Sequence, residues 1–515
     1  MKKVKNQLRV GAVMSYINMA IGSLIPMFYT PIMLSILGQD EYGLYRLSAS
    51  VTSYLSLISF GIGSAIVRYL TKYRFEGDKE GEQNMLGLFN IIFAVIAAVS
   101  FVVGTVIAIN AGLVYADSLK TEESLHELQL LIFLLTINTS ISFLFSPYNA
   151  VISCHERFVF LQFTNIIITV ITPIVNIIIL YLGFANVGMV CSSIFMNIVV
   201  MILYWMYVKH SIGIKAKYRN MPFNLLKEIL FFSFWIFVAN IVNQLYSTTD
   251  TLIIGAVPAL ATIGVAVYNV GTTFNIMMSN FSIGILNVLT PSVNKLVFTR
   301  NDPKELTDMM IRIGRIQCYI VGLVCSGFIA FGRQFLTLWV GQSYLDAYWV
   351  AISTMIPACV PLVQNVAMNV IIAQNKHRFR SLVYLFIAVL NVGGTMLCVN
   401  QFGIIGAAVV TGIASIIGQG FIMNWYYWKR INLDIPRFWK NIGKMFLYPI
   451  GLCIVFLLVF SFIDLNNWIL LFAGIVAYTI LFIAVNWKFV MNDYEKDIFR
   501  VPITKMLNVI KGGKD

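Results

Sequence analysis

Long apolar segments alternate with short basic loops along the whole chain, and this alternation restricts the fold to a membrane protein with many spans. Of 515 residues, 59% are hydrophobic and 11% are charged, whereas soluble domains carry about 25% charged residues. A helix needs about 20 apolar residues to cross the hydrocarbon core of a bilayer. The sequence therefore predicts an all-α integral membrane protein and excludes a pair of soluble domains.

Fourteen segments meet this length rule. They are Val10–Leu37, Gly43–Leu70, Met85–Ile109, Leu128–Val151, Phe158–Leu182, Val187–Val208, Leu225–Gly255, Ile263–Val297, Ile311–Phe331, Ala347–Ala373, Leu382–Val399, Ile404–Trp428, Met445–Ile463 and Trp468–Val485.

The basic residues fall on one set of alternating loops. Thirty-three of the 36 lysines and arginines lie there, and the exceptions are Arg46, Lys120 and Arg333. The positive-inside rule then predicts a multi-pass protein of the plasma membrane with both termini in the cytoplasm. The net charge of +13 is explained by this orientation, so we expect no nucleic-acid partner.

Part of the sequence repeats at an offset of about 220 residues. Asn149, Arg157-Phe158, Gly183, Trp205 and Lys209 correspond to Asn369, Arg378-Phe379, Gly403, Trp425 and Lys429. Because six spans separate the two sets, the halves have the same orientation in the membrane. We therefore expect two pseudo-symmetric six-helix lobes, 1–215 and 216–435, followed by two extra transmembrane helices and a cytoplasmic tail in 436–515.

Polar side chains at helical spacing within apolar spans indicate surfaces that face protein or water. The seventh span carries the clearest stripe, and the second and eighth spans carry others. Either these stripes line a cleft between the lobes or they form hydrogen bonds between helices. The residues concerned are Ser233, Asn240, Asn243, Gln244, Ser247, Asp250, Arg46, Ser50, Ser53, Ser56, Asn269, Thr273 and Asn280.

Two ionisable side chains lie inside the spans. Arg46 near the start of span two and Asp250 in the outer part of span seven are expected at similar depth. Charges are costly at that depth, so we predict that the pair forms an outer gate. The alternative is that each side chain bonds within its own lobe or extends to the interface.

A second group of charges, Arg68, Lys295, Arg312 and Arg315, lies near the cytoplasmic ends of spans two, eight and nine. If these side chains turn inward, they form a basic vestibule that can hold a phosphate or pyrophosphate. If they turn outward, they are ordinary orientation signals.

Signals for catalysis, a cofactor or a metal are weak. No Walker loop, GxSxG elbow or HExxH spacing occurs, and the four histidines, His126, His155, His210 and His377, lie in or near loops. The seven cysteines show no metal spacing and are expected as small core residues. We predict a protein that is not an enzyme and has neither cofactor nor metal.

Three stretches give the chain a resemblance to a known family. They are Leu37-Gly38 with Tyr42–Tyr45, Phe60–Gly63 with Ala65–Tyr69, and Leu336–Gly341 (LTLWVG) with Tyr344 and Ala347. These resemble the Wzx-type polysaccharide flippases of the multidrug/oligosaccharidyl-lipid/polysaccharide exporter superfamily. The resemblance covers essentially the whole chain, including the arrangement of six, six and two spans.

The resemblance implies a transporter that turns undecaprenyl-pyrophosphate-linked oligosaccharide repeat units from the inner to the outer leaflet by alternating access, for cell-surface polysaccharide assembly. Arg46 and Asp250 would then form the outer gate or couple transport to an ion. The residues expected to bind the headgroup are Arg68, Lys295, Arg312, Arg315, Asn240, Asn243, Gln244 and Asn269. Its implied partners are the lipid-linked substrate and the bilayer, with polysaccharide polymerases and glycosyltransferases as candidates. Two alternatives stay open: a cation-coupled multidrug exporter of the same superfamily, and a membrane glycosyltransferase or polymerase. The second usually needs a large outer loop, and the longest one here, about residues 110–127, is short.

Overall fold

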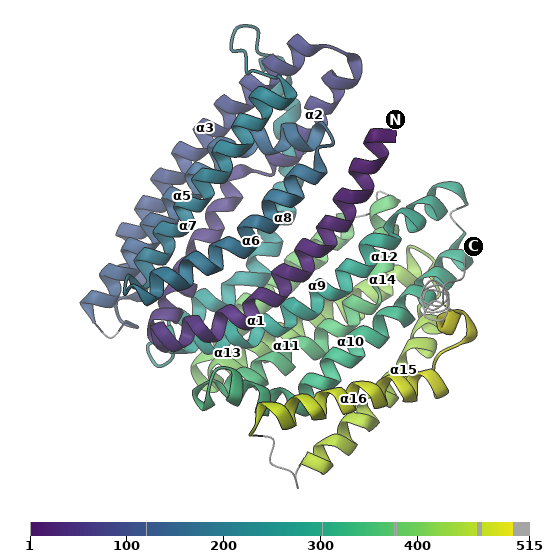
Figure 1. Cartoon of the computed structure of the whole chain (residues 1–515). Coiled ribbons are helices and arrows are strands. Elements are labelled where there is room, and N and C mark those ends of the chain that lie inside the picture. Colours follow the sequence, from purple (N-terminus) through teal and green to yellow (C-terminus); the bar gives the residue numbers. More distant parts are fainter. Residues whose placement is uncertain are drawn as a thin grey trace, which may run out of the picture. The chain divides into compact units, whose positions relative to one another are not determined.

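The computed structural model of the chain describes residues 2–119, 121–300, 302–374, 376, 378–460 and 466–497. Lys120, His377 and the end of the predicted thirteenth span at residues 461–463 lie outside them. Within this part of the chain every regular element is helical and no strand occurs (Figure 1). The predicted all-α class is confirmed. The helices are α1 Lys2–Ser53, α2 Ile62–Glu76, α3 Lys79–Ile109, α4 Gly112–Tyr115, α5 Glu122–Cys154, α6 Phe158–Tyr181, α7 Ala185–Tyr207, α8 Leu226–Gly255, α9 Ala261–Thr299, α10 Pro303–Trp339, α11 Asp346–Val363, α12 Asn365–Ala373, α13 Arg378–Ser415, α14 Met423–Lys429, α15 Ile435–Phe460 and α16 Trp468–Phe489.

Eleven helical segments among the described residues are long and apolar enough to cross a membrane. Two of them, 64 and 51 residues long, far exceed the roughly 20 residues of one crossing. The first is interrupted by two glycines with positive φ, Gly38 at 79° and Gly61 at 71°, and the second by one, Gly403 at 60°. A multi-pass membrane protein is therefore established, and the count of fourteen spans stays a prediction.

Local sequence signals explain where several helices begin. The Asp78 carboxylate accepts a hydrogen bond from the Gly81 amide at 2.8 Å and caps α3. Asp302 caps α10 in the same way, and Pro303 follows at the first helical position. Both residues suit a helix N-terminus, since a carboxylate satisfies free amides and proline lacks one.

The chain divides into two compact units by its internal contacts. Unit 1 comprises Met1–Val270 and Tyr384–Thr411, and unit 2 comprises Gly271–Val383 and Gly412–Asp515. These boundaries differ from the repeat boundaries inferred from the sequence, and the two-lobe division stays a prediction.

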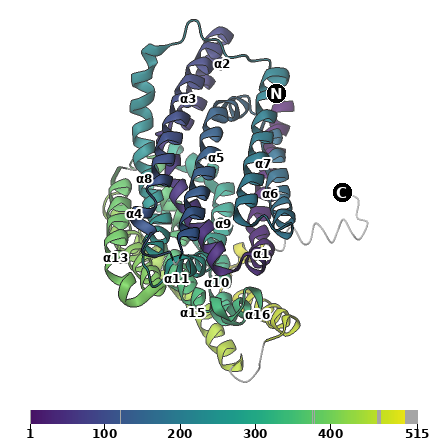
Figure 2. The same ribbon diagram turned by 90° about the vertical axis from the view of Figure 1, so that its left-hand side faces the viewer.

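In unit 1, α5 packs between α3 and α7, while α6 packs against α1 (Figure 2). The core at the α2, α3 and α5 contact contains fully buried Leu70, Phe89 and Val151. In unit 2, α15 and α16 pack against α10 (Figure 1). Rings of Phe331, Phe456 and Tyr478 meet edge-on or tilted there, with centroids 5.0–6.1 Å apart, an arrangement typical of stable aromatic clusters.

An aromatic stack recurs in both sequence halves at nearly the predicted offset. Phe160 stacks on Tyr207 with ring centroids 3.8 Å apart, and Phe379 stacks on Tyr426 at 4.3 Å. Gly183 and Gly403, paired by the sequence comparison, both have positive φ. These features accord with a duplication without establishing the symmetry of the whole.

Candidate transport site

Asp250 lies in a fully polar cage inside unit 1. Its carboxylate accepts hydrogen bonds from the Tyr268 hydroxyl at 2.6 Å, the Asn391 amide at 3.0 Å and the Thr395 hydroxyl at 3.1 Å. The Thr411 hydroxyl donates a further one at 2.5 Å. Asp250 is only 3% exposed, and all four partners are neutral. The cage therefore holds one carboxylate without a basic partner among these contacts.

The helices that build this cage are α8, α9 and α13. Asn391 and Thr395 are four residues apart on α13, which places them on one face of that helix. The Thr411 hydroxyl also lies 2.8 Å from the Asn391 amide oxygen. The sequence singled out Asp250 but missed all four partners. The spacing of Asn391 and Thr395 in an apolar span was the one signal that could have found them.

Arg46 bonds to Asn269 and not to Asp250 in this structure. Its Nε and a terminal guanidinium nitrogen donate to the Asn269 amide oxygen at 3.0 and 2.7 Å. Asn269 is only 5% exposed, and its amide oxygen accepts both of these hydrogen bonds. The gate predicted from the sequence is not formed as an ion pair between Arg46 and Asp250.

A further contact joins α1 to α9 near the Gly38 turn. The Thr262 hydroxyl donates to the Asp40 carboxylate at 2.7 Å. A Cβ added at Gly43 would lie 1.9 Å from the Thr262 carbonyl oxygen, so the two backbones touch. We call this region the Gly38 end; at this end the helices are closely packed.

Farther from the Gly38 end, polar side chains of α8 are exposed. Asn240, Asn243 and Ser247 lie on the surface of a helix that is otherwise strongly apolar. Gln244 is partly buried and donates to the Thr248 and Ser53 hydroxyls. An amide exposed at this depth is costly in lipid, whereas a water-filled space accepts it.

The predicted basic residues have different surroundings. In unit 1, Arg68 on α2 is exposed, and its guanidinium carbon lies 4.6 Å from the centre of the Phe232 ring. In unit 2, Lys295 is exposed, and Arg312 is exposed with its guanidinium 4.5 Å from the Tyr494 ring. Such stacking leaves the guanidinium edge free to bind an anion.

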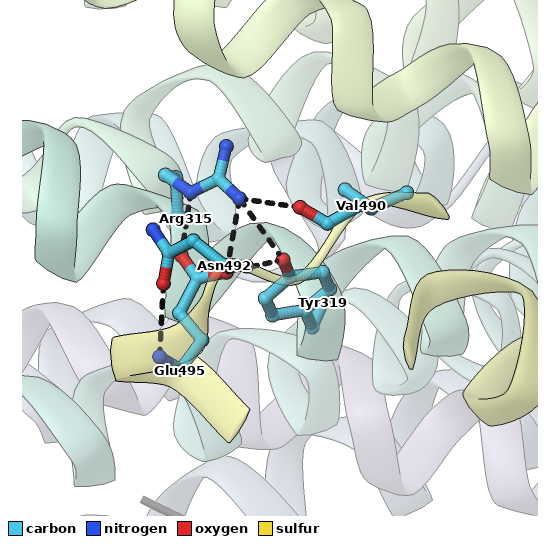
Figure 3. A network of polar contacts seen from close by, with 5 residues as sticks. All are labelled: Arg315, Tyr319, Val490, Asn492 and Glu495. Carbon is cyan, nitrogen blue, oxygen red and sulfur yellow. Dashed lines mark hydrogen bonds and ion pairs between the residues drawn. The ribbon is translucent and has the colours of Figure 1, made fainter. Parts of the chain in front are cut away.

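Arg315 has a carboxylate partner (Figure 3). Its Nε lies 2.5 Å from Glu495 Oε1, and a terminal nitrogen donates to Glu495 Oε2 at 2.9 Å and to the Val490 carbonyl at 2.8 Å. The Tyr319 hydroxyl also donates to Glu495 at 2.8 Å, and the Asn492 backbone amide donates at 3.1 Å. Burial raises the pKa of the Glu495 carboxyl, but hydrogen bonds from Arg315 and Tyr319 outweigh it, so that the pKa lies below its ordinary value.

Sequence reasoning missed a basic pocket on α15. A pocket of about 450 Å³ in unit 2 is lined by Arg437, Lys440 and Lys444 together with Arg315 and Tyr448. Arg437 pairs with Asp308 at 2.8 Å. Arg437, Lys440 and Lys444 follow one another at three and four positions, which places them on one face of a helix. From the sequence we interpreted them only as a signal for orientation in the membrane.

The fold defines a multi-span membrane protein, and the comparisons with known proteins define its class as a flippase-type transporter. The model of the polysaccharide biosynthesis protein family matches residues 32–349. The chain belongs to this family, and the predicted Wzx-type membership is confirmed. It is 20% identical over 397 residues to a putative O-antigen transporter of Shigella flexneri, covering 76% of this chain and 90% of that protein.

Two groups of solved structures share the fold. The lipid II flippase MurJ in an inward closed conformation has a TM-score of 0.68 at 16% identity and covers 93% of this chain and 99% of its own. An inward-facing multidrug resistance MATE family transporter has a TM-score of 0.62 at 15% identity, with coverages of 83% and 99%. The family and these relatives consist of transporters and not of enzymes.

Proposed function

We propose that this protein turns undecaprenyl-pyrophosphate-linked oligosaccharide repeat units from the inner to the outer leaflet by alternating access, for cell-surface polysaccharide assembly. Family membership and the likeness to a putative O-antigen transporter support this function. The observation that carries it is the exposed amide face of α8, at Asn240 and Asn243, within an apolar helix. A water-accessible amide face can bind the hydroxyls of a sugar headgroup, while a polyprenyl tail can remain in lipid.

The proposed orientation follows from the basic loops. With fourteen spans and both termini in the cytoplasm, Arg68, Lys295 and Arg312 lie at the inner side and the Gly38 end lies at the outer side. The protein then crosses the plasma membrane as two six-helix lobes with two additional helices. The closed packing at the Gly38 end is what an inward-open state requires of its outer side.

The headgroup is proposed to bind first through exposed cations. In unit 1, Arg68 is proposed to supply charge for a pyrophosphate, and Asn240, Asn243 and Gln244 are proposed to supply amides for sugar hydroxyls. In unit 2, Lys295 and Arg312 are proposed to supply such charge by themselves. Asn269 serves the outer gate in place of headgroup binding. Arg315 has its charge matched by Glu495, so we give it a structural role instead. Lys440 and Lys444 in the α15 pocket are proposed to form a further anion-binding site.

The outer gate is proposed to use Arg46 with Asn269, and Asp250 is proposed to couple transport to a cation or proton. A buried carboxylate surrounded by neutral donors is expensive to keep charged. Binding of a cation or proton removes that cost, and it would bias the helices α8, α9 and α13 toward the packing seen here. The partners implied by the pathway are polysaccharide polymerases and glycosyltransferases that make and use the carrier.

A deletion strain tests the proposal through its lipid carriers. We expect repeat units to accumulate on carriers in the inner leaflet and wild-type protein to clear them. Arg68→Gln should slow clearance about tenfold, since one charged hydrogen bond contributes roughly 1.5–3 kcal/mol. Lys217→Gln is the matched control, because Lys217 is an exposed cation paired with Glu80.

The multidrug exporter predicts a different outcome. Carriers would be unchanged in the deletion strain while sensitivity to cationic drugs rises, and that result would overturn the flippase proposal. For Asp250, Asp250→Asn should remove the dependence of flipping on a sodium or proton gradient; a gradient dependence equal to wild type would exclude its coupling role.

A further inference from the structure

Three potential metal ligands meet at one end of unit 1, beside the last turns of α2. Glu82 lies in the first turns of α3, Cys154 is the last residue of α5, and His155 follows it. One ligand atom of each residue lies within 4.8 Å of the other two. Glu82 and Cys154 are each 4% exposed, and His155 is partly buried, so solvent reaches the cluster from one side.

The hydrogen bonding of His155 fixes which nitrogen faces the cluster. Its Nδ1 lies 3.0 Å from the Val151 carbonyl oxygen, and a carbonyl can only accept, so Nδ1 carries the proton. In the neutral ring Nε2 is then a bare lone pair. Metal-binding histidines are oriented in the same way, by a hydrogen bond from the second ring nitrogen to a carbonyl or carboxylate.

One carboxylate oxygen of Glu82 faces His155 Nε2 and has no hydrogen-bond partner. This atom, Oε1, is buried and unsatisfied, and it lies 3.5 Å from His155 Nε2. This distance is too long for a good hydrogen bond. Two ligands bound to one zinc ion by bonds of about 2.1 Å at tetrahedral angles lie about 3.4 Å apart. The spacing thus suits two ligands of a common ion.

Cys154 completes the set with a soft donor. The Thr71 hydroxyl lies 3.3 Å from its sulfur, which leaves the remaining lone pairs of the sulfur for an ion. Arg74 donates to the Cys154 carbonyl, and its positive charge opposes a cation. Two anionic ligands, a carboxylate and a thiolate, offset that charge together with much of the charge of a divalent ion.

We propose that Glu82, Cys154 and His155 form a binding site for a divalent transition-metal ion of the zinc type. One thiolate, one imidazole and one carboxylate suit Zn²⁺ among the common ions, and the fourth position is left for water. A bound ion would tie the start of α3 to the connection between α5 and α6. This proposal differs from the sequence-based expectation of no metal and does not depend on the transported substrate.

Cobalt(II) absorption of the purified full-length protein in detergent tests this site. A thiolate bound to Co²⁺ gives a near-ultraviolet charge-transfer band that carboxylate and imidazole ligands do not give. We expect one Co²⁺ per chain with this band, displaced by Zn²⁺. Cys154→Ser should abolish the band, and Glu82→Gln and His155→Gln should weaken Zn²⁺ binding at least tenfold.

Two variants provide matched controls. Cys191→Ser removes an exposed thiol, and His210→Gln removes an exposed imidazole; both should bind metal as wild type does. Gel filtration and circular dichroism establish that each variant is folded, and Glu82→Gln, which keeps size and polarity, serves if Cys154→Ser is unstable. Absence of the band in wild type, or an undiminished band in Cys154→Ser, would overturn the proposal.

Discussion

The pair of Arg315 and Glu495 anchors the segment after α16 to α10. The Arg315 side chain is 15% exposed and that of Glu495 is 2% exposed, so removal of either charge leaves the other largely buried. We expect Glu495→Gln to lower the free energy of unfolding by about 2–3 kcal/mol, measured by thermal unfolding in detergent.

Glu80→Gln is the control for this variant. Glu80 pairs with Lys217 at 3.2 Å, but the two side chains are 67% and 49% exposed, and exposed pairs contribute about 0–1 kcal/mol. Equal losses in the two variants would show that burial of the Arg315 pair adds nothing.

The same pair predicts a dependence of stability on pH. Because the pKa of Glu495 is lowered in the folded protein, its contribution is complete above the ordinary glutamate pKa. It is lost as the pH falls through the lowered value, since protonation then ends the charge pairing. The difference in unfolding temperature between wild type and Glu495→Gln should therefore shrink in acid. A difference that stays constant down to the acid limit would contradict this assignment.

Single residues could be predicted where their chemistry is unusual for their place. Arg46 and Asp250 were found because ionisable groups are rare in apolar spans. Asn269 was also singled out, but the pairings could not be predicted, because Asn269 lies 223 positions from Arg46 and Thr411 lies 161 positions from Asp250. Only the folded chain brings them together.

Among the elements, two glycines allow sharp reversals within nearly continuous helices. Gly403 has φ of +60°, and a Cβ there would meet nothing closer than 3.8 Å, so the cost of a side chain is conformational. We expect Gly403→Ala to lower the free energy of unfolding by about 1–2 kcal/mol. Thermal unfolding of the purified variant measures it.

Gly393 on the same helix is the natural comparison. It has helical backbone angles, and an added Cβ finds open space, so Gly393→Ala should be neutral or stabilise by up to about 1 kcal/mol. If Gly403→Ala were as stable as Gly393→Ala, the left-handed turn would not be required.

Helices were the most predictable feature because hydropathy is set by the bilayer. The predicted span Phe158–Leu182 differs from α6 by one residue at its end. The predicted span Ala347–Ala373 instead contains a break at Gln364 between α11 and α12. Pro361 precedes that break, but proline is frequent inside membrane helices, so the sequence did not distinguish a kink from a continuous helix.

Cysteines were expected in the core, and five of seven are buried, whereas Cys191 is exposed.

At the scale of the molecule, the proposed alternating access requires that the Gly38 end opens. The side-chain oxygens of Asp40 and Thr262 lie 2.7 Å apart, close enough for cysteines at these positions to form a disulfide. In a Cys191→Ser background, oxidised Asp40→Cys/Thr262→Cys should stop flipping, and a reductant should restore it. Carrier analysis before and after reduction provides the measurement.

Each single-cysteine variant controls for the substitutions themselves and should remain active under oxidation. Full flipping by a completely cross-linked double variant would show that this end stays closed throughout the cycle.

In the predicted fourteen-span arrangement, Gly38 within α1 links the first two membrane crossings without a flexible connector. A rotation of the first crossing is therefore transmitted to the second, because no flexible segment lies between them. We expect the two crossings to move as one rigid unit, and a flexible spacer inserted at Gly38 should uncouple their motions.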